Sequence, residues 1–272
     1  MKYIIDKELK YVKDITKHLA RYNVSYTGVR PTDEAYIYVL NNKALIGVLI
    51  IKLKWDCVFL NEYFYSNIDV LKLMLSKVCE LYKEKAKAIR VSTDVLERIN
   101  DFKELKFEIE GILQTSTKTS KKYYFAYYKF DIESNSNFEV IIKKDPILEY
   151  ESIFKERLVK FREENKISIK KEELEIVALR NNNFVGGVKL TIFKDSIYVD
   201  MLVVIEKYRG ENIGSKLMEL VEEEAEKRNL DSVYLETVLS REFYEKMGYK
   251  KVVTKKNQPK DFNSYLLVKQ IK

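Results

Sequence analysis

The sequence predicts an α/β (α+β) fold built from two tandem copies of one unit of strands and helices. Three observations carry this prediction. Strand-like and helix-like apolar patterns alternate along all 272 residues. The pattern of residues 1–132 recurs in residues 137–272 at a nearly constant offset. Only the second copy contains an apolar run that leads through a glycine-containing turn into an amphipathic helix, at 203–220.

Length and composition indicate a globular protein with one large domain or two domains of ordinary size. Hydrophobic residues make up 46% of the chain and charged residues 33%. No apolar run approaches the roughly 20 residues that a membrane helix needs, and the first residues lack the apolar core of a signal peptide. We therefore expect a cytoplasmic protein without a membrane partner.

The charge distribution disfavours a nucleic-acid binder. The 49 Lys and Arg against 42 Asp and Glu give a net charge of +7, but the two signs are interleaved and form no basic stripe. The aromatic run at 123–128 fits a half-buried strand better than a base-stacking platform. Cys57, Cys79 and the single histidine, His18, have no metal-type or triad-type spacing, so we expect no metal site.

The first copy contains short strand-like runs separated by turns, with helices at 3.6-residue spacing. After a short apolar segment at 3–5, strands are predicted at 35–40, 44–53, 57–65, 88–91, 107–113 and 122–130, and helices at about 9–22, 71–82 and 95–105. Small polar residues at 131–137 break the periodicity, so this stretch is predicted to be the linker between the copies.

The second copy repeats the same order. Strands are predicted at 138–145, 174–180, 184–193, 197–204, 233–238, 250–253 and 264–271, and helices at 146–165, after the turn at 209–214 and at 241–249. Gly47 corresponds to Gly186 and Asn61 to Asp200 at an offset of 139 (186 minus 47), whereas Phe102 corresponds to Tyr244 at 142 (244 minus 102). The first copy is therefore shorter in the loop before its central helix.

That loop differs in chemistry as well as in length. At the later offset, Ile68 and Lys72 stand in the places of Gly210 and Gly214. Long and β-branched side chains prevent a backbone from approaching an anion closely, as a glycine-containing turn can at a helix N-terminus. Only the second copy is therefore expected to bind a phosphate group in this way.

Two motifs of the second copy resemble the GNAT superfamily of acyl-CoA N-acyltransferases. Arg209-Gly210-Glu211-Asn212-Ile213-Gly214 is similar to the family's pyrophosphate signature, with Asn212 in place of a glycine. Phe243-Tyr244-Glu245-Lys246-Met247-Gly248-Tyr249 is similar to its FYEKxGF segment. The resemblance covers 137–272 fully and 1–132 as a degenerate copy without the pyrophosphate loop. It implies a mixed, mostly antiparallel sheet in each copy, with fourth and fifth strands that splay apart in the second copy.

The resemblance also implies a set of binding residues and a reaction. Acetyl-CoA would be the co-substrate, and a small-molecule or peptide amine would attack its thioester directly, with no metal. The pantetheine arm would pair with the edge of the fourth strand, and the loop would hold the pyrophosphate. The residues that the resemblance assigns to these contacts are Leu202, Val203, Val204, Arg209, Gly210, Glu211, Asn212, Ile213, Gly214 and Ser215.

Proton transfer requires an acid for the leaving thiolate and a base for the amine. Tyr244 stands in the place of the family's general acid, and a phenol with a pKa near ~10 keeps its proton at neutral pH; packing against the cofactor is its alternative role. Asp200 and Glu236 are the candidates for the base by position, and Asp200 is preferred.

The leading functional hypothesis is an N-acetyltransferase, active as a monomer or a homodimer, whose first copy shapes the acceptor pocket or mimics a partner subunit. The alternative is a non-catalytic acyl-CoA-binding regulatory module. The identity of the acceptor does not follow from the fold, because one fold serves many acceptors.

Overall fold

The computed structural model describes residues 1–29, 32–116, 122–165, 171–256 and 261–271. The first copy contains β1 (Lys2–Asp6), α1 (Val12–Thr27), β2 (Thr32–Asn41), β3 (Ala44–Lys54), β4 (Cys57–Tyr65), α2 (Ile68–Tyr82), β5 (Ala88–Thr93), α3 (Leu96–Glu104), β6 (Glu108–Leu113) and β7 (Tyr123–Tyr128). The second contains β8 (Glu139–Lys143), α4 (Leu148–Glu164), β9 (Glu172–Arg180), β10 (Asn183–Ile192), β11 (Ser196–Val204), the 3₁₀ turn η1 (Glu206–Tyr208), α5 (Ile213–Lys227), β12 (Ser232–Thr237), α6 (Arg241–Lys246), β13 (Lys250–Lys255) and β14 (Ser264–Gln270).

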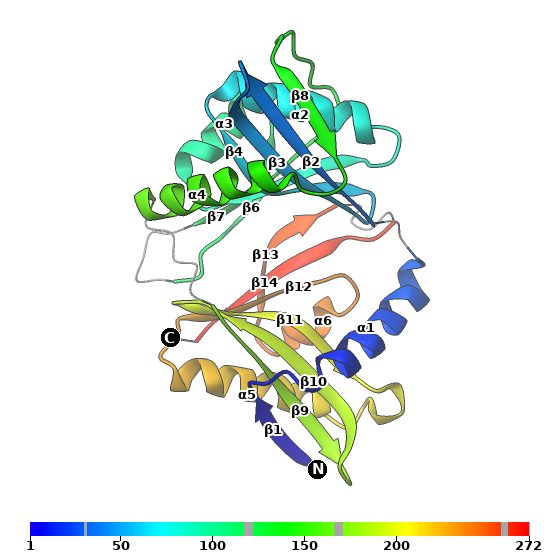
Figure 1. Ribbon diagram of the computed structural model, residues 1–272. Coiled ribbons are helices and arrows are strands. Elements are labelled where there is room, and N and C mark those ends of the chain that lie inside the picture. The colour runs from blue at the N-terminus through cyan, green and yellow to red at the C-terminus, as the bar shows by residue number, and fades with distance from the viewer. Residues whose placement is uncertain (30–31, 117–121, 166–170, 257–260, 272) are drawn as a thin grey trace.

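The strands form one 14-stranded sheet in the order β1-β9-β10-β11-β12-β14-β13-β6-β7-β5-β4-β3-β2-β8. The pairs β4–β5 and β11–β12 are parallel, and the other described pairs are antiparallel. Helices flank the sheet (Figure 1). The predicted fold, with a mixed and mostly antiparallel sheet flanked by helices, is confirmed.

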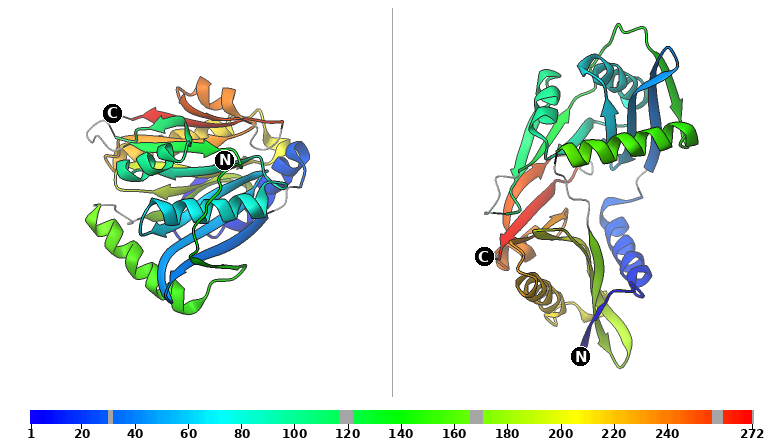
Figure 2. Two further views of the ribbon diagram at one scale, coloured as in Figure 1. Left: turned by 90° about the horizontal axis from the view of Figure 1, so that it is seen from above. Right: turned by 60° about the vertical axis from the view of Figure 1, so that its left-hand side comes forward.

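The two halves of the sheet exchange their first strand and helix. Strand β1 pairs along its whole length with β9 of the second copy, and α1 packs on β10 and β11. Conversely, β8 pairs with β2 of the first copy, and Phe154 of α4 is buried against Tyr38 and Val48. In Figures 1 and 2 the blue α1 accordingly lies with β9–β14, and the green α4 lies with β2–β7.

We therefore name the halves by their sheets. The N-half is β2–β7 with β8, α2, α3 and α4, and the C-half is β9–β14 with β1, α1, α5 and α6. Each half has its own large apolar core beneath its central helix, α2 or α5. The linker at 131–137 stays a prediction about where one sequence copy ends and the next begins. The spatial halves do not divide the chain at that point, because each half takes its first strand and helix from the other copy.

The repeat is visible in the irregularities of the sheet. The ladder between β3 and β4 shifts register at Asn61, and the ladder between β10 and β11 shifts at Asp200. A second pair of bulges lies at Glu110 and Val252. An inserted residue bends and twists a strand locally, and these bulges lie at corresponding positions of the two copies.

The fourth and fifth strands of the C-half splay apart as predicted. Strand β11 runs to Val204, but its parallel pairing with β12 covers only Ser196 to Val199. Beyond Val199 the facing edges of the two strands are free to accept another partner. The N-half has the same feature, because β4 pairs with β5 only from Cys57 to Phe59.

The halves meet where β6 pairs with β13 at Gly111 and Val253. A Cβ on Gly111 would lie 2.8 Å from the carbonyl oxygen of Val252 and 2.6 Å from Cγ2 of Val253, so the close approach of the two backbones requires glycine. Beside this contact, Arg90 and Glu110 form an ion pair whose side chains are only 5% and 6% exposed. Arg90 also donates to the carbonyl of Lys256, at 3.0 Å, and so links the two halves.

Candidate functional site

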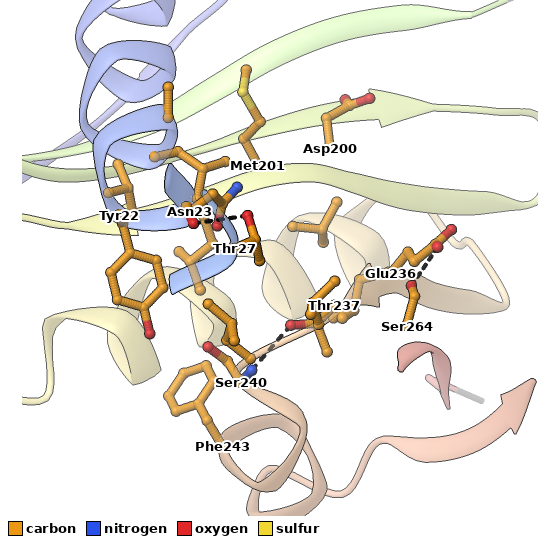
Figure 3. A pocket seen from close by; sticks show the side chains of 18 of the residues that line it. Tyr22, Asn23, Thr27, Asp200, Met201, Glu236, Thr237, Ser240, Phe243 and Ser264 are labelled. Atoms are coloured by element: carbon orange, nitrogen blue, oxygen red, sulfur yellow. Dashed lines mark hydrogen bonds between the residues drawn. The ribbon is translucent and has the colours of Figure 1, made fainter. Parts of the chain in front are cut away.

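A cavity of 1170 Å³ is lined by side chains from both halves. The C-half contributes the splayed part of β11, the turn before α5, the end of β12 and α6, together with the exchanged helix α1. Figure 3 shows side chains from these elements around the cavity. Of the residues that the sequence assigns to the site, all except Glu211 line this cavity.

The turn before α5 presents a row of free backbone amides. The first hydrogen bond within the helix runs from the amide of Lys216 to the carbonyl of Asn212, at 3.0 Å, so the amides of Ile213, Gly214 and Ser215 precede the hydrogen-bonded turns. Asn212 is the N-cap residue, and its side chain makes no capping hydrogen bond. Amides at a helix N-terminus, together with the helix dipole, attract an anion.

Asn212 adopts the conformation that its position requires. Its φ of 58° and ψ of 15° place it in the left-handed region, where Asn is the most tolerated residue after glycine. Gly210 has a φ of +84°. The substitution of Asn for the signature glycine is therefore compatible with the turn.

The corresponding helix of the N-half is closed to an anion. Helix α2 begins at Ile68, directly after Ser66 and Asn67, whereas residues 205–212 separate β11 from α5. The side chain of Asn67 accepts a hydrogen bond from the amide of Val70, at 3.1 Å. The Asn67 side chain therefore caps α2, whereas no described side chain caps the start of α5.

The two charged residues of the turn have different neighbours. Arg209 lies at the cavity, where its Nε donates to the carbonyl of Val204 at 3.3 Å and its guanidinium lies 4.4 Å from the centre of the Tyr22 ring. Glu211 forms an ion pair with Arg180, which holds the pKa of its carboxyl below the ordinary value. Glu211 is therefore an ion-paired carboxylate and not a free one.

Tyr244 lies on α6 with its ring fixed by two neighbouring rings. The centres of the Phe243 and Tyr249 rings lie 4.9 Å and 5.9 Å away, and only 7% of Tyr244 is exposed. Burial raises the pKa of its phenol, so the group keeps its proton at neutral pH. Tyr244 also lines the cavity, so a bound molecule can contact this side chain.

Asp200 is the bulged residue of β11 and lines the same cavity. Its Oδ2 accepts a hydrogen bond from the hydroxyl of Thr191 at 2.8 Å and lies 4.0 Å from Nζ of Lys189. Burial raises the pKa of Asp200, although both neighbours act in the opposite direction. A carboxylate with a raised pKa is better matched to accepting a proton near neutral pH.

Glu236, the other candidate for the base, is already engaged. Nζ of Lys255 lies 2.7 Å from one of its oxygens, and the hydroxyl of Ser264 donates to the other (Figure 3). Burial alone would raise the pKa of Glu236, but these two partners outweigh it and hold the pKa below the ordinary value. The geometry therefore favours Asp200 over Glu236.

Sequence reasoning did not identify the side chains that reach the cavity from the first copy. They come from α1, which the exchange places on the C-half, and from the β3–β4 hairpin of the N-half. Among them are Tyr22, Asn23, Thr27, Lys52, Lys54, Trp55, Phe59 and Asn61. The repeat could have indicated one of these residues, Asn61, because it corresponds to the predicted site residue Asp200.

The described residues lack two further kinds of feature. No cluster of three or more His, Cys, Asp or Glu side chains there is arranged to hold a metal ion. None of the helices in the described ranges is both long and apolar enough to cross a membrane.

Comparisons with known proteins agree on one family. Residues 140–249 match the model of the acetyltransferase (GNAT) family. Acetyltransferase Atu2258 of Agrobacterium fabrum is 30% identical over 113 residues, which are 40% of this chain and 74% of that protein. N-alpha-acetyltransferase 30 of Schizosaccharomyces pombe is 31% identical over 86 residues, 28% of this chain and 57% of that protein. A crystal structure of an acetyltransferase from Bacillus cereus aligns with a TM-score of 0.42 and 21% identity, covering 47% of this chain and 96% of that one.

Proposed function

Because this chain belongs to the acetyltransferase (GNAT) family, we propose that it is an N-acetyltransferase that transfers the acetyl group of acetyl-CoA to a primary amine. The amine attacks directly, with both substrates bound together. The observation that carries this proposal is that one cavity joins the open amides of α5, the protonated phenol of Tyr244 and the carboxylate of Asp200.

The residues of the C-half fit acetyl-CoA. The amides at the start of α5 and the guanidinium of Arg209 suit the pyrophosphate, because no side chain caps the helix. The free edge of β11 from Leu202 to Val204 suits the amides of the pantetheine arm. When bound, acetyl-CoA supplies an activated acyl group with a thiol as its leaving group.

Two side chains, Asp200 and Tyr244, carry out the proton transfers. Asp200 accepts a proton from the attacking ammonium or amine, directly or through water, and burial brings its pKa toward the working range. Tyr244 donates its phenolic proton to the departing thiolate. The fixed position of its ring favours this role, since a positioned acid needs no reorganisation during the reaction.

We further propose that 137–272 is the catalytic copy and that 1–132 is a copy without a cofactor loop. The short connection before α2 and the Asn67 cap support this division of roles. Because α1 of the first copy lines the cavity, the second copy cannot supply the complete cavity without the first.

The proposal is tested by release of free thiol from acetyl-CoA in the presence of a broad panel of amines, with mass detection of the acetylated product. We expect thiol release that depends on the amine. Binding of CoA without transfer to any amine of the panel would instead favour the non-catalytic acyl-CoA-binding module.

A substitution at Thr191 tests the role of Asp200 through pH. The hydroxyl of Thr191 stabilises the ionised carboxylate, so Thr191→Val should raise the pKa of Asp200 further. Because the base acts in its ionised form, the acidic limb of the kcat/KM profile should move to higher pH. Thr191→Ser keeps the hydroxyl and should leave the limb in place, whereas an unchanged limb in Thr191→Val would remove Asp200 from the role of base.

A further inference from the structure

One wall of the cavity is the outer face of the β3–β4 hairpin in the N-half. Successive side chains of a strand point to opposite faces, and one face of this hairpin is committed to the N-half core through Ile51, Leu53, Val58 and Leu60. The other face lines the cavity. We call it the hairpin face, and it consists of Lys52, Lys54, Phe59 and Asn61.

The hairpin face corresponds by the repeat to the part of the C-half that contains Asp200. Asn61 and Asp200 are both bulged residues of the fourth strand in their half, and both line the same cavity. The amide of Asn61 can donate and accept hydrogen bonds but cannot act as a base at neutral pH. The first copy thus contributes a binding surface to the active site of the second.

The charges around the cavity are unfavourable to a polycationic acceptor. Among the described lining residues, the carboxylates are those of Asp200 and Glu236, and Glu236 is already paired with Lys255. The hairpin face adds the ammonium group of Lys54 and that of Lys52, whose Nζ lies 3.7 Å from Oε2 of Glu34 and is partly neutralised by it. A second or third ammonium on the acceptor would meet like charges in a cavity of reduced dielectric.

The cavity also offers apolar surface. The rings of Trp55 and Phe59 from the hairpin and of Tyr198 from β11 line it, and Trp55 lies in the turn of the hairpin with a φ of 49°. Aromatic rings of this kind bury the apolar body of a ligand, while a few polar groups fix its orientation.

We propose that the acceptor is a monoamine with an apolar body and one acidic group, as in an apolar amino acid, and that Lys52 and Lys54 bind the acidic group. The inference rests on the proposed acetyl transfer and adds the class of the acceptor. Asp200 then receives the proton of the amine, and Lys52 and Lys54 bind the acidic group of the same molecule.

Matched acceptors test this directly on the full chain with acetyl-CoA. Phenylalanine, leucine and tryptophan are compared with phenethylamine, isoamylamine and tryptamine, which differ from them only by loss of the carboxylate. Spermidine and kanamycin are the polycationic acceptors. We expect at least one amino acid to exceed its decarboxylated partner in kcat/KM by about tenfold, and both polycations to be poorer acceptors still.

A pair of charge variants assigns the effect to the hairpin face. The double variant Lys52→Gln/Lys54→Gln should remove the preference for the amino acid by raising its KM, with the Kd for CoA unchanged. Lys72→Gln/Lys87→Gln removes two charges outside the cavity lining and should behave as the unmodified chain. Binding of the amino acid to the CoA complex, measured by calorimetry, gives a readout independent of turnover.

The outcomes separate the two proposals. Preference for spermidine or kanamycin, equal rates for each matched pair, or an undiminished preference in Lys52→Gln/Lys54→Gln would overturn the acceptor class while acetyl transfer stands. Absence of transfer to every amine, with CoA bound, would overturn the proposed function and the acceptor class with it.

Discussion

Replacing Tyr244 with Phe is expected to lower kcat by about 10²- to 10⁴-fold, the usual contribution of a positioned general acid. The ring contacts with Phe243 and Tyr249 do not involve the hydroxyl, so the packing of α6 should be retained. The Kd for CoA should stay unchanged, because the amides before α5 and the edge of β11 are not altered. Steady-state kinetics and calorimetric titration with CoA measure the two effects separately.

Tyr249→Phe is the matched control for this variant. It removes the same hydroxyl from a neighbouring buried tyrosine that is 2% exposed and does not line the cavity. Its kcat should remain within about twofold of the unmodified chain, because Phe keeps the ring that packs on Tyr244 and the lost hydroxyl belongs to a residue outside the cavity lining. Equal losses in the two variants, or a wild-type kcat in Tyr244→Phe, would leave Tyr244 with a packing role only.

Replacing Arg90 with Leu is expected to lower the free energy of unfolding by about 3–5 kcal/mol, as when one partner of a buried ion pair is removed. The guanidinium donates to both oxygens of Glu110, at 3.0 Å and 2.9 Å, to Sγ of Cys57 at 2.6 Å and to the carbonyl of Lys256. Its loss leaves the Glu110 carboxylate buried without its partner. Urea denaturation followed by circular dichroism gives the change.

The double variant Arg90→Leu/Glu110→Leu distinguishes an uncompensated charge from lost packing. An apolar pair in place of a buried ion pair is often neutral, so the double variant should be more stable than Arg90→Leu alone. The loss of unfolding free energy in the double variant could instead equal the sum of the losses in Arg90→Leu and Glu110→Leu. The two side chains would then make no coupled contribution to stability.

Local features of the fold could be predicted from the sequence because local residues determine them. The strand at 197–204, the turn at 209–214 and the short helix that starts at Arg241 follow from apolar spacing, glycine and Asn, and the structure has all three. The repeat also predicted that the loop before α2 is the shorter one, and α2 indeed starts directly after Asn67.

The exchange of the first strands and helices could not be predicted in the same way. Strands β1 and β8 are both short, half-apolar edge strands, so their sequences do not indicate which of them pairs with β2 and which with β9. The choice depends on tertiary contacts such as the hydrogen bond from the amide of Ile147 to the hydroxyl of Tyr38, at 3.0 Å. Contacts of that kind join residues far apart in the chain and leave no periodic signal.

The composite cavity was missed for a related reason. Alternation predicts that Lys52 and Asn61 share the face of the hairpin that turns away from the core, but a polar face is usually solvated. Only the packing of the two halves shows that this face meets the C-half. The same packing brings Lys255 of β13 and Ser264 of β14 to Glu236, which is why we propose Asp200 rather than Glu236 as the base.

The number of CoA molecules bound per chain tests the central claim, that the molecule has two copies of one unit and a single cofactor loop. Calorimetric titration of the full chain with CoA should give one site, because the amides of α5 are open and α2 is capped by Asn67. Two sites per chain, or none, would contradict it.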